Sequence, residues 1–165
     1  MSLAGWVAEL GRTLEDTRLG EAVRGTRYLY ATLESVHVIG IALLVGAAVA
    51  VDLRLLGFAR HAVPATVVTR YLLPISHLGF AVVAVTGAAM LVGNAMAVSA
   101  SPAAPWKFGL IAVAGLNVAV FHLGIYRTVH AWDLSATPPL AAKASAVVSA
   151  VTWSAVVVAG RFLAY

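Results

Sequence analysis

The sequence predicts an all-α protein, an integral membrane four-helix up-down bundle with an N-terminal amphipathic surface helix. Of its 165 residues, 61% are hydrophobic and only 11% are charged, whereas soluble domains carry about 25% charged residues. The mean hydropathy is +0.92. Four apolar runs also reach the length of about 20 residues that a helix needs to cross a bilayer. A surface so poor in charge is suited to lipid and not to water.

The N-terminal segment has a different pattern from the rest of the chain. Residues 2–23 mix acidic and basic side chains with apolar residues at loose helical spacing. This pattern is typical of an amphipathic helix that lies in the plane of the membrane surface. We therefore predict a surface helix over residues 2–23.

Four transmembrane helices follow, and together they give a single membrane domain over residues 1–165. The predicted spans are residues 28–53, 71–98, 106–128 and 140–163. Their short connections favour antiparallel neighbours. The many valines do not predict strands, because the runs lack period-two alternation and a lone strand cannot satisfy its backbone in hydrocarbon.

Composition excludes several kinds of site. The chain has no cysteine, which rules out disulfides, thiolate metal sites, iron–sulfur clusters and thioether-linked haem. The net charge of +4 comes from basic residues scattered at the ends of the apolar runs. Basic residues in such places contact lipid headgroups, so we expect a lipid bilayer as partner and no nucleic acid.

Away from the ends of the predicted spans, the acidic, basic and histidine residues are Glu34, His37, His77 and His122. Ionisable residues within a bilayer are rare, costly and usually functional. At about 1.5 Å per residue, His77 and His122 fall at matching depth, and His37 lies within about one to two turns of them. Three histidines from three helices are therefore predicted to converge on one level of the bundle.

Such a convergence indicates a haem site. Two histidines on different helices are suitable axial ligands of a b-type haem, and bundle cores are where these sites are built. We rank His122 first as a ligand, His37 second and His77 third. Gly40 and Gly79 are predicted to leave room for the flat macrocycle.

Further residues complete the predicted haem site. Arg54 and Arg127 lie at the membrane boundary, where their planar guanidinium groups suit the haem propionates. The same three histidines are candidate metal ligands. A copper or zinc site with Glu34 is a weaker interpretation, because zinc sites normally show tighter ligand sets.

Glu34 and His37 are separated by three residues and share a helical face. The carboxylate can accept the second ring N–H of His37 and so fix its tautomer. Glu34 is also the candidate catalytic residue, passing protons to a bound quinone. The structural alternative is a salt bridge from Glu34 to Arg27 or to a loop arginine.

Asp52 and Arg54 close the first span. Because they are two residues apart, they do not share a helix face. We expect each to pair with another element: Asp52 with Arg127 or Arg70, and Arg54 with Asp133.

Three segments resemble a bacterial family of small four-helix membrane proteins of unknown function. ESVHVIGIALLVGAAVAVDLRLLG (34–57) resembles its first-helix signature, E-x-x-H-x-x-G followed by D-L-R-L-L-G. LLPISHLGFAVVAVTGAAML (72–91) and PWKFGLIAVAGLNVAVFH (105–122) resemble its second and third helices. The resemblance covers residues 24–133.

This resemblance implies a multi-pass protein of the bacterial inner membrane. The residues that carry its pattern are Glu34, His37, Asp52, Arg54 and His122. The overall plan is also similar to small four-helix b-type cytochromes, although architecture by itself does not assign function.

The leading hypothesis is a b-type cytochrome that exchanges electrons with quinone, with another redox protein or a second copy of the chain as further candidate partners. One alternative is a non-catalytic membrane subunit whose polar residues set helix packing and partner docking. In that case each intramembrane histidine makes only an interhelical hydrogen bond, worth about 0.6 kcal/mol. A further alternative is a small transporter or metal-handling protein.

Overall fold

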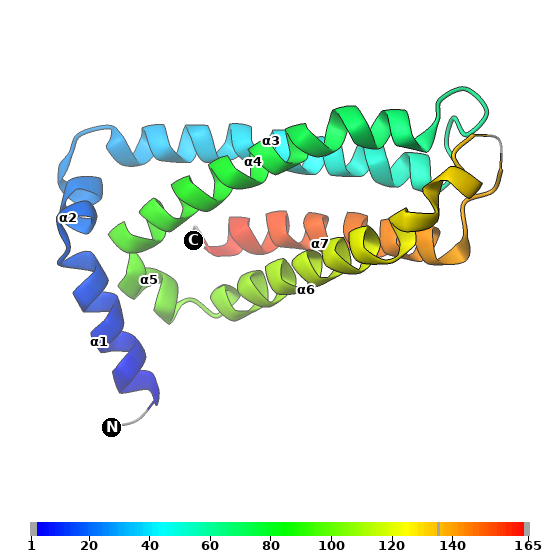
Figure 1. The fold of residues 1–165 in the computed structure, drawn as a ribbon. Helices are drawn as coiled ribbons and strands as arrows, with labels where there is room; N and C mark the ends of the chain where they lie inside the picture. Colours follow the sequence, from blue (N-terminus) through cyan, green and yellow to red (C-terminus); the bar gives the residue numbers. More distant parts are fainter. Residues whose placement is uncertain (1–2, 135, 164–165) are drawn as a thin grey trace.

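The chain folds into helices joined by short loops, which confirms the all-α class (Figure 1). The computed structural model describes residues 3–134 and 136–163, with side chains from residue 5 onward. The helices are α1 (Leu3–Glu15), α2 (Arg18–Gly25), α3 (Leu29–Leu55), α4 (Ala65–Gly93), α5 (Ala95–Ala100), α6 (Ala103–Leu123), the 3₁₀ helix η1 (Ile125–Ala131) and α7 (Leu140–Leu163).

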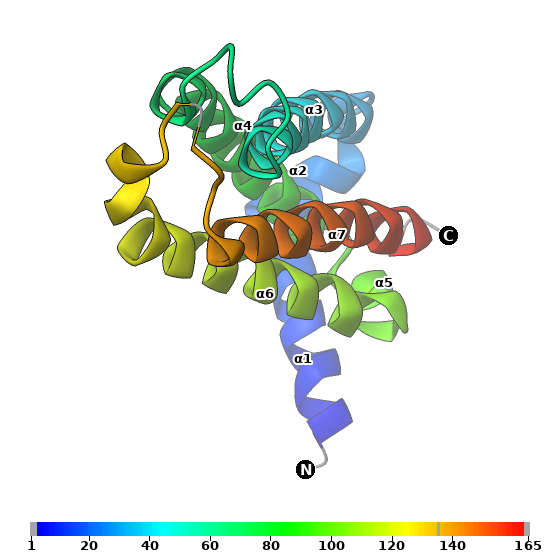
Figure 2. The ribbon, with the colours of Figure 1, turned by 90° about the vertical axis from the view of Figure 1, so that its right-hand side faces the viewer.

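The four long helices form two tight pairs. Helix α3 packs along α4, α6 packs along α7, and α3 joins the pairs by contacting α7. Viewed end-on, α3 and α4 lie above α7 and α6 (Figure 2). Helices α4 and α6 make no extensive contact with each other. The bundle is therefore open along one side.

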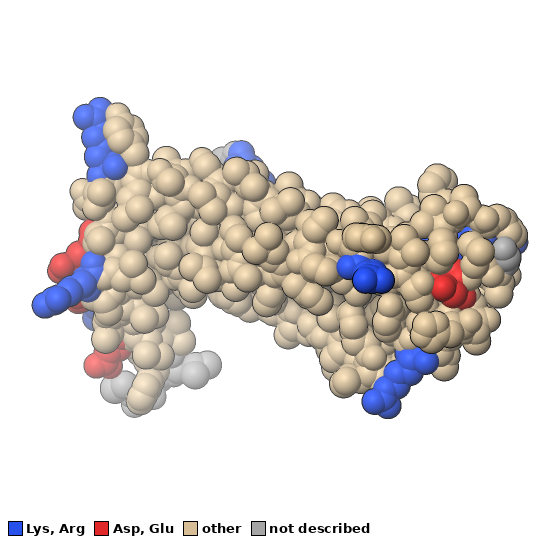
Figure 3. Space-filling view, turned by 45° about the horizontal axis from the view of Figure 1, so that its top comes forward, with Lys and Arg blue, Asp and Glu red and all other residues tan. Residues whose placement is uncertain are grey.

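The long helices have the dimensions of membrane spans. Helices α3, α4, α6 and α7 contain 27, 29, 21 and 24 residues, and each has an apolar stretch long enough to cross a bilayer. The surface shows a broad uncharged band, with charged side chains mostly at the two ends (Figure 3). The chain is a multi-pass membrane protein whose bundle contacts the lipid bilayer.

The observed helices differ in detail from the predicted segments. The surface helix predicted over 2–23 is two helices, α1 and α2, because the Thr17 side chain accepts a hydrogen bond from the Gly20 N–H and starts a new helix there. Residues 1, 2, 164 and 165, which the predicted domain includes, lie outside the described residues, as does residue 135.

The second and third spans are shifted. The span predicted over 71–98 begins at Ala65 and ends at Gly93, and the last residues of the prediction belong to α5. The span predicted over 106–128 runs from Ala103 to Leu123 and is followed by η1. Helix α4 begins early because Asp133, which is distant in sequence, caps its first turn: Asp133 Oδ1 accepts the Thr66 N–H at 2.7 Å, and Oδ2 accepts the Thr66 hydroxyl at 2.8 Å.

Glycines bring α3 and α4 into backbone contact. A Cβ on Gly79 would lie 2.5 Å from the Leu44 nitrogen and 2.8 Å from the Gly40 oxygen. A Cβ on Gly40 would lie 2.9 Å from methyl groups of Val82 and Val83. The prediction that Gly40 and Gly79 leave room for a macrocycle is therefore wrong, because helix packing already occupies that space.

Arg54 joins the loops at one end of the bundle. It is 3% exposed, and its Nε and Nη2 atoms donate to the carbonyls of Val63 and Asp133, both at 2.6 Å. The expected pairing with Asp133 is present, but through the main-chain carbonyl. Two of its nitrogens bond loop carbonyls, and the third, Nη1, is buried without a hydrogen-bond partner within the described residues. Because the whole group is buried, Arg54 is not placed to hold a propionate at the surface.

We predict that Gly79→Ala lowers the free energy of unfolding by about 1–3 kcal/mol, because a methyl group there overpacks the α3–α4 contact. Thermal unfolding in detergent measures the effect. Gly109→Ala is the matched control, since nothing lies within 4 Å of a Cβ at that position. Equal stability of the two variants would contradict the close contact.

We also predict a pH-dependent contribution from Asp133. Burial raises its pKa, but hydrogen bonds from the Thr66 N–H and hydroxyl, with the charges of His130 and Arg54, outweigh burial and lower the pKa overall. A lowered folded pKa contributes stability that is present above the unfolded value of about 3.9 and is lost as pH falls through the folded value.

Asp133→Ala should therefore cost about 1 kcal/mol at neutral pH, typical of a lost helix cap, and the difference from the parent should shrink below about pH 4. Unfolding midpoints across pH measure this. Asp16→Ala serves as control, because its exposed side chain makes no hydrogen bond within the described residues. A pH-independent difference would show that the ionised carboxylate is not responsible.

Candidate cofactor site

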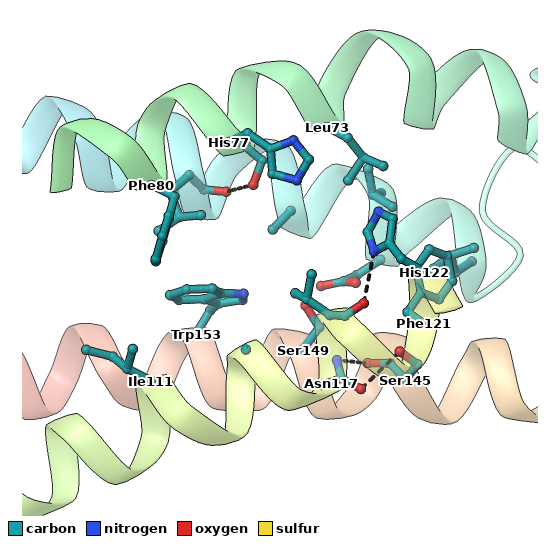
Figure 4. A pocket seen from close by; sticks show the side chains of 18 residues that line it. Leu73, His77, Phe80, Ile111, Asn117, Phe121, His122, Ser145, Ser149 and Trp153 are labelled. Atoms are coloured by element: carbon teal, nitrogen blue, oxygen red, sulfur yellow. Dashed lines mark hydrogen bonds between the residues drawn. The ribbon is translucent and has the colours of Figure 1, made fainter. Parts of the chain in front are cut away.

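A cavity of about 460 Å³ lies between the two helix pairs, on the open side of the bundle (Figure 4). All four long helices line it, and most of its wall is apolar. The polar side chains on its wall are Asp52, Ser76, His77, Asn117, His122, Ser145 and Ser149. An apolar pocket with a few convergent polar groups is the usual form of a small-molecule or cofactor site.

Two histidines face each other across the opening. His77 projects from α4 and His122 from α6, with ring centroids 6.3 Å apart and ring planes at 44° (Figure 4). The Phe121 ring packs edge-on against His122, with centroids 5.4 Å apart. The structure therefore brings together the two histidines whose predicted depths matched.

The hydrogen bond of His122 fixes which nitrogen is available. His122 Nδ1 lies 2.9 Å from the Val118 carbonyl oxygen. A carbonyl only accepts, so Nδ1 carries the proton and Nε2 keeps a free lone pair. Fixing one ring nitrogen in this way is how proteins orient ligating histidines. Within the described residues, the His77 ring makes no hydrogen bond.

The spacing of the pair suits a metal ion placed between the rings. A ligating imidazole nitrogen lies about 2.0–2.1 Å from the metal and about 1.1 Å from its own ring centre, so two rings on opposite sides of one ion have centres about 6.3 Å apart. The observed separation is 6.3 Å. Rotation of one ring about the shared axis changes the interplanar angle without moving the nitrogens, so the tilt is compatible with this arrangement.

His37 does not join this pair. Its Nδ1 lies 2.8 Å from the Thr86 hydroxyl oxygen, and that hydroxyl donates to the Val82 carbonyl at 2.6 Å. Thr86 follows His77 by nine residues on α4, a rise of about 14 Å. The prediction that three histidines converge at one level is therefore wrong for His37, which links α3 to α4.

Glu34 and Arg127 also lie away from the cavity wall. Glu34 is exposed on the first half of α3, and Arg127 is exposed on η1, five residues after His122. Among the described residues, no cluster of three or more His, Cys, Asp or Glu side chains is arranged to hold a metal ion. The histidine pair supplies two imidazole nitrogens, which suits a cofactor that brings its own equatorial ligands.

Asp52 is the cavity residue that sequence reasoning missed. It is 5% exposed, and its Oδ2 atom has no hydrogen-bond partner within the described residues. The predicted pairing with Arg70 or Arg127 is wrong, because both arginines are exposed and neither reaches it. The available signal was its spacing from Ala48 and Leu55, which places all three on one helix face.

The remaining polar groups of the wall are largely satisfied. Asn117 Nδ2 donates to the Ser145 carbonyl, and Ser145 Oγ donates to Asn117 Oδ1, both at 3.0 Å, which ties α6 to α7. Ser76 Oγ donates to the Leu44 carbonyl at 3.2 Å and ties α4 to α3. These side chains have structural partners, and Ser149 hydrogen-bonds the Asp52 carboxyl group, so Asp52 Oδ2 and the two histidines are the groups available to a bound molecule.

Fold and site define a small four-helix membrane protein with a lipid-facing cavity between its two helix pairs. Residues 13–165 match the model of a family described as "Family of unknown function (DUF6644)", and the chain belongs to that family. The match covers all four spans and every residue of the cavity. No curated protein and no solved structure matches the chain.

We predict that His37 and Thr86 are coupled by about 0.6 kcal/mol, the average for such intramembrane hydrogen bonds. A double-mutant cycle of His37→Ala and Thr86→Val, read by thermal unfolding, measures the coupling. A control cycle pairs Ser35→Ala with Thr86→Val, because Ser35 bonds only within its own helix, to Ala31. Additive effects in the first cycle would show that the bond does not join the helices.

Proposed function

We propose that the protein is a b-type cytochrome-like electron-transfer protein of the bacterial cytoplasmic membrane, with haem b held between His77 and His122. The observation that carries the proposal is the 6.3 Å separation of the two imidazole rings across a cavity between otherwise separated helices. A haem held by two histidines supplies reversible one-electron chemistry.

The chain's own residues suit this role. The His122 ring is held by the Val118 carbonyl with Nε2 free, and His77 faces it from a different helix. The separation of α4 and α6 leaves an opening through which a macrocycle can extend toward lipid. On α6, Gly115 lines the cavity and has nothing within 4 Å of an added Cβ, so the wall offers space for a flat group.

Two roles change relative to the sequence-based hypothesis. His77 replaces His37 as the partner of His122, because His37 is committed to Thr86. Arg127 remains a candidate propionate partner because it is exposed just beyond His122, whereas Arg54 is committed to loop carbonyls. Quinone remains the electron-exchange partner that we propose, since its lipid solubility matches the open side of the bundle.

We predict that the full-length protein, expressed with haem available, shows the sharp α and β bands of low-spin haem when reduced with dithionite. His122→Ala and His77→Ala should each abolish this low-spin spectrum, because each removes an axial ligand. His37→Ala is the matched control and should keep it. Absorption spectra of the purified variants decide the result.

Two outcomes would contradict the cytochrome proposal. One is a parent protein that binds no haem. The other is loss of the low-spin spectrum on His37→Ala while His77→Ala retains it, which would mean that the ligand pair is the one ranked first from sequence. Lost packing does not explain a split between these variants, because all three substitutions remove the same side chain.

A further inference from the structure

We propose that the inner wall of the cavity, at Asp52, is a binding site for a lipid-soluble ring molecule that carries a phenolic hydroxyl group. This inference deepens the proposed quinone partnership, on which its quinol ligand rests, and it does not require bound haem. It rests on an unpartnered buried carboxyl oxygen, on the shape and aromatic lining of the cavity, and on the route into it.

The carboxyl group of Asp52 has one oxygen without a protein partner, although Ser149 hydrogen-bonds the group. The residue is 5% exposed and lines the cavity, and its Oδ2 atom has no hydrogen-bond partner within the described residues. Leaving a buried polar atom unsatisfied costs about 1–3 kcal/mol, and more for a charged group. A carboxyl group keeps acceptor capacity in either protonation state. The site therefore favours a ligand that brings a hydrogen-bond donor.

The remainder of the cavity favours an apolar ring. Trp153 from α7, Phe80 from α4 and Phe121 from α6 line it together with aliphatic side chains. Cavities of about 150 Å³ already bind benzene, and this one measures about 460 Å³. A ring of phenol size therefore leaves room for a substituent, such as an apolar tail.

The route into the cavity passes through lipid. Two wall residues near the opening, Phe80 and Val118, are 48% and 38% exposed on the apolar surface. His77 is exposed and His122 partly exposed, whereas Asp52 lies on the buried side. The histidine pair thus occupies the mouth and Asp52 the inner wall, so a molecule dissolved in the bilayer reaches Asp52 between α4 and α6 when no haem fills the mouth. A phenol or quinol with apolar substituents meets all these conditions.

The test compares two probes that differ only in the donor, para-bromophenol and para-bromoanisole, because bromine quenches a tryptophan that it contacts. Full-length protein in lipid nanodiscs is titrated with each, and binding is read from the part of the tryptophan fluorescence that the Trp153→Phe variant assigns to Trp153, one of four tryptophans in the chain. We expect the phenol to quench at about tenfold lower concentration than its methyl ether, as one hydrogen bond to a carboxylate provides at least that ratio.

Variants locate the effect. Trp153→Phe should remove the saturable quenching, and Asp52→Leu should remove the preference for the phenol. Asp52→Asn keeps an acceptor oxygen and a similar shape, so it should retain part of the preference for the phenol. If Asp52→Leu does not fold, Asp52→Asn takes its place in the test. Asp133→Asn is the acidic control outside the cavity and should behave as the parent.

Equal quenching by phenol and ether in the parent would overturn the proposal, as would a preference that survives Asp52→Leu in folded protein. The probes are titrated into protein prepared without haem, and the haem spectrum is recorded on a separate preparation expressed with haem available. Failure of the cytochrome proposal is therefore seen as missing haem bands. Failure of the Asp52 proposal is seen as missing selectivity for the phenol.

Discussion

The backbone contact between α3 and α4 sets the geometry of the whole bundle. Gly79 lies so close to α3 that a single methyl group there would meet the Leu44 nitrogen at 2.5 Å. In lipid, where no hydrophobic force drives helices together, such close approach is a main source of association. Because α3 is held tightly to α4 and also contacts α7, the main contact between the two pairs of long helices is the one between α3 and α7. Helix α4 is then left without α6 as a neighbour, and the cavity follows from that arrangement.

The polar side chains divide according to this geometry. Where helices touch, the buried polar groups have partners: Ser76 bonds to α3, His37 meets Thr86, and Asn117 pairs with Ser145. At the end of the bundle, Arg54 and Asp133 bond the loops to the start of α4. Where the helices separate, Asp52 has an oxygen without a partner and His77 has no hydrogen bond within the described residues. The residues available to bind a ligand are therefore polar residues to which helix packing gives no complete set of hydrogen-bond partners.

The sequence predicts well what depends on one helix at a time. Apolar length predicts the four spans, and the rise of about 1.5 Å per residue correctly predicts that His77 and His122 share a depth. It fails where the answer depends on a neighbouring helix. The depth of a residue does not determine which way its side chain points around the helix axis. His37 points toward α4, where its ring contacts the Thr86 hydroxyl. Likewise, the start of α4 depends on Asp133, and the isolation of Asp52 depends on the absence of α6 from the side of α4, which no local pattern encodes.

The lateral opening of the cavity determines whether its ligands come from water or from the bilayer. A pocket that opens to water responds to aqueous concentration, so a poorly soluble molecule rarely reaches it. A pocket that opens between α4 and α6 responds to concentration in the bilayer, where an apolar molecule is enriched by about 0.8 kcal/mol for each CH₂ group it carries. A modest intrinsic affinity is then sufficient for occupancy. Selectivity rests on the few polar atoms inside, because every apolar competitor in the membrane has the same access.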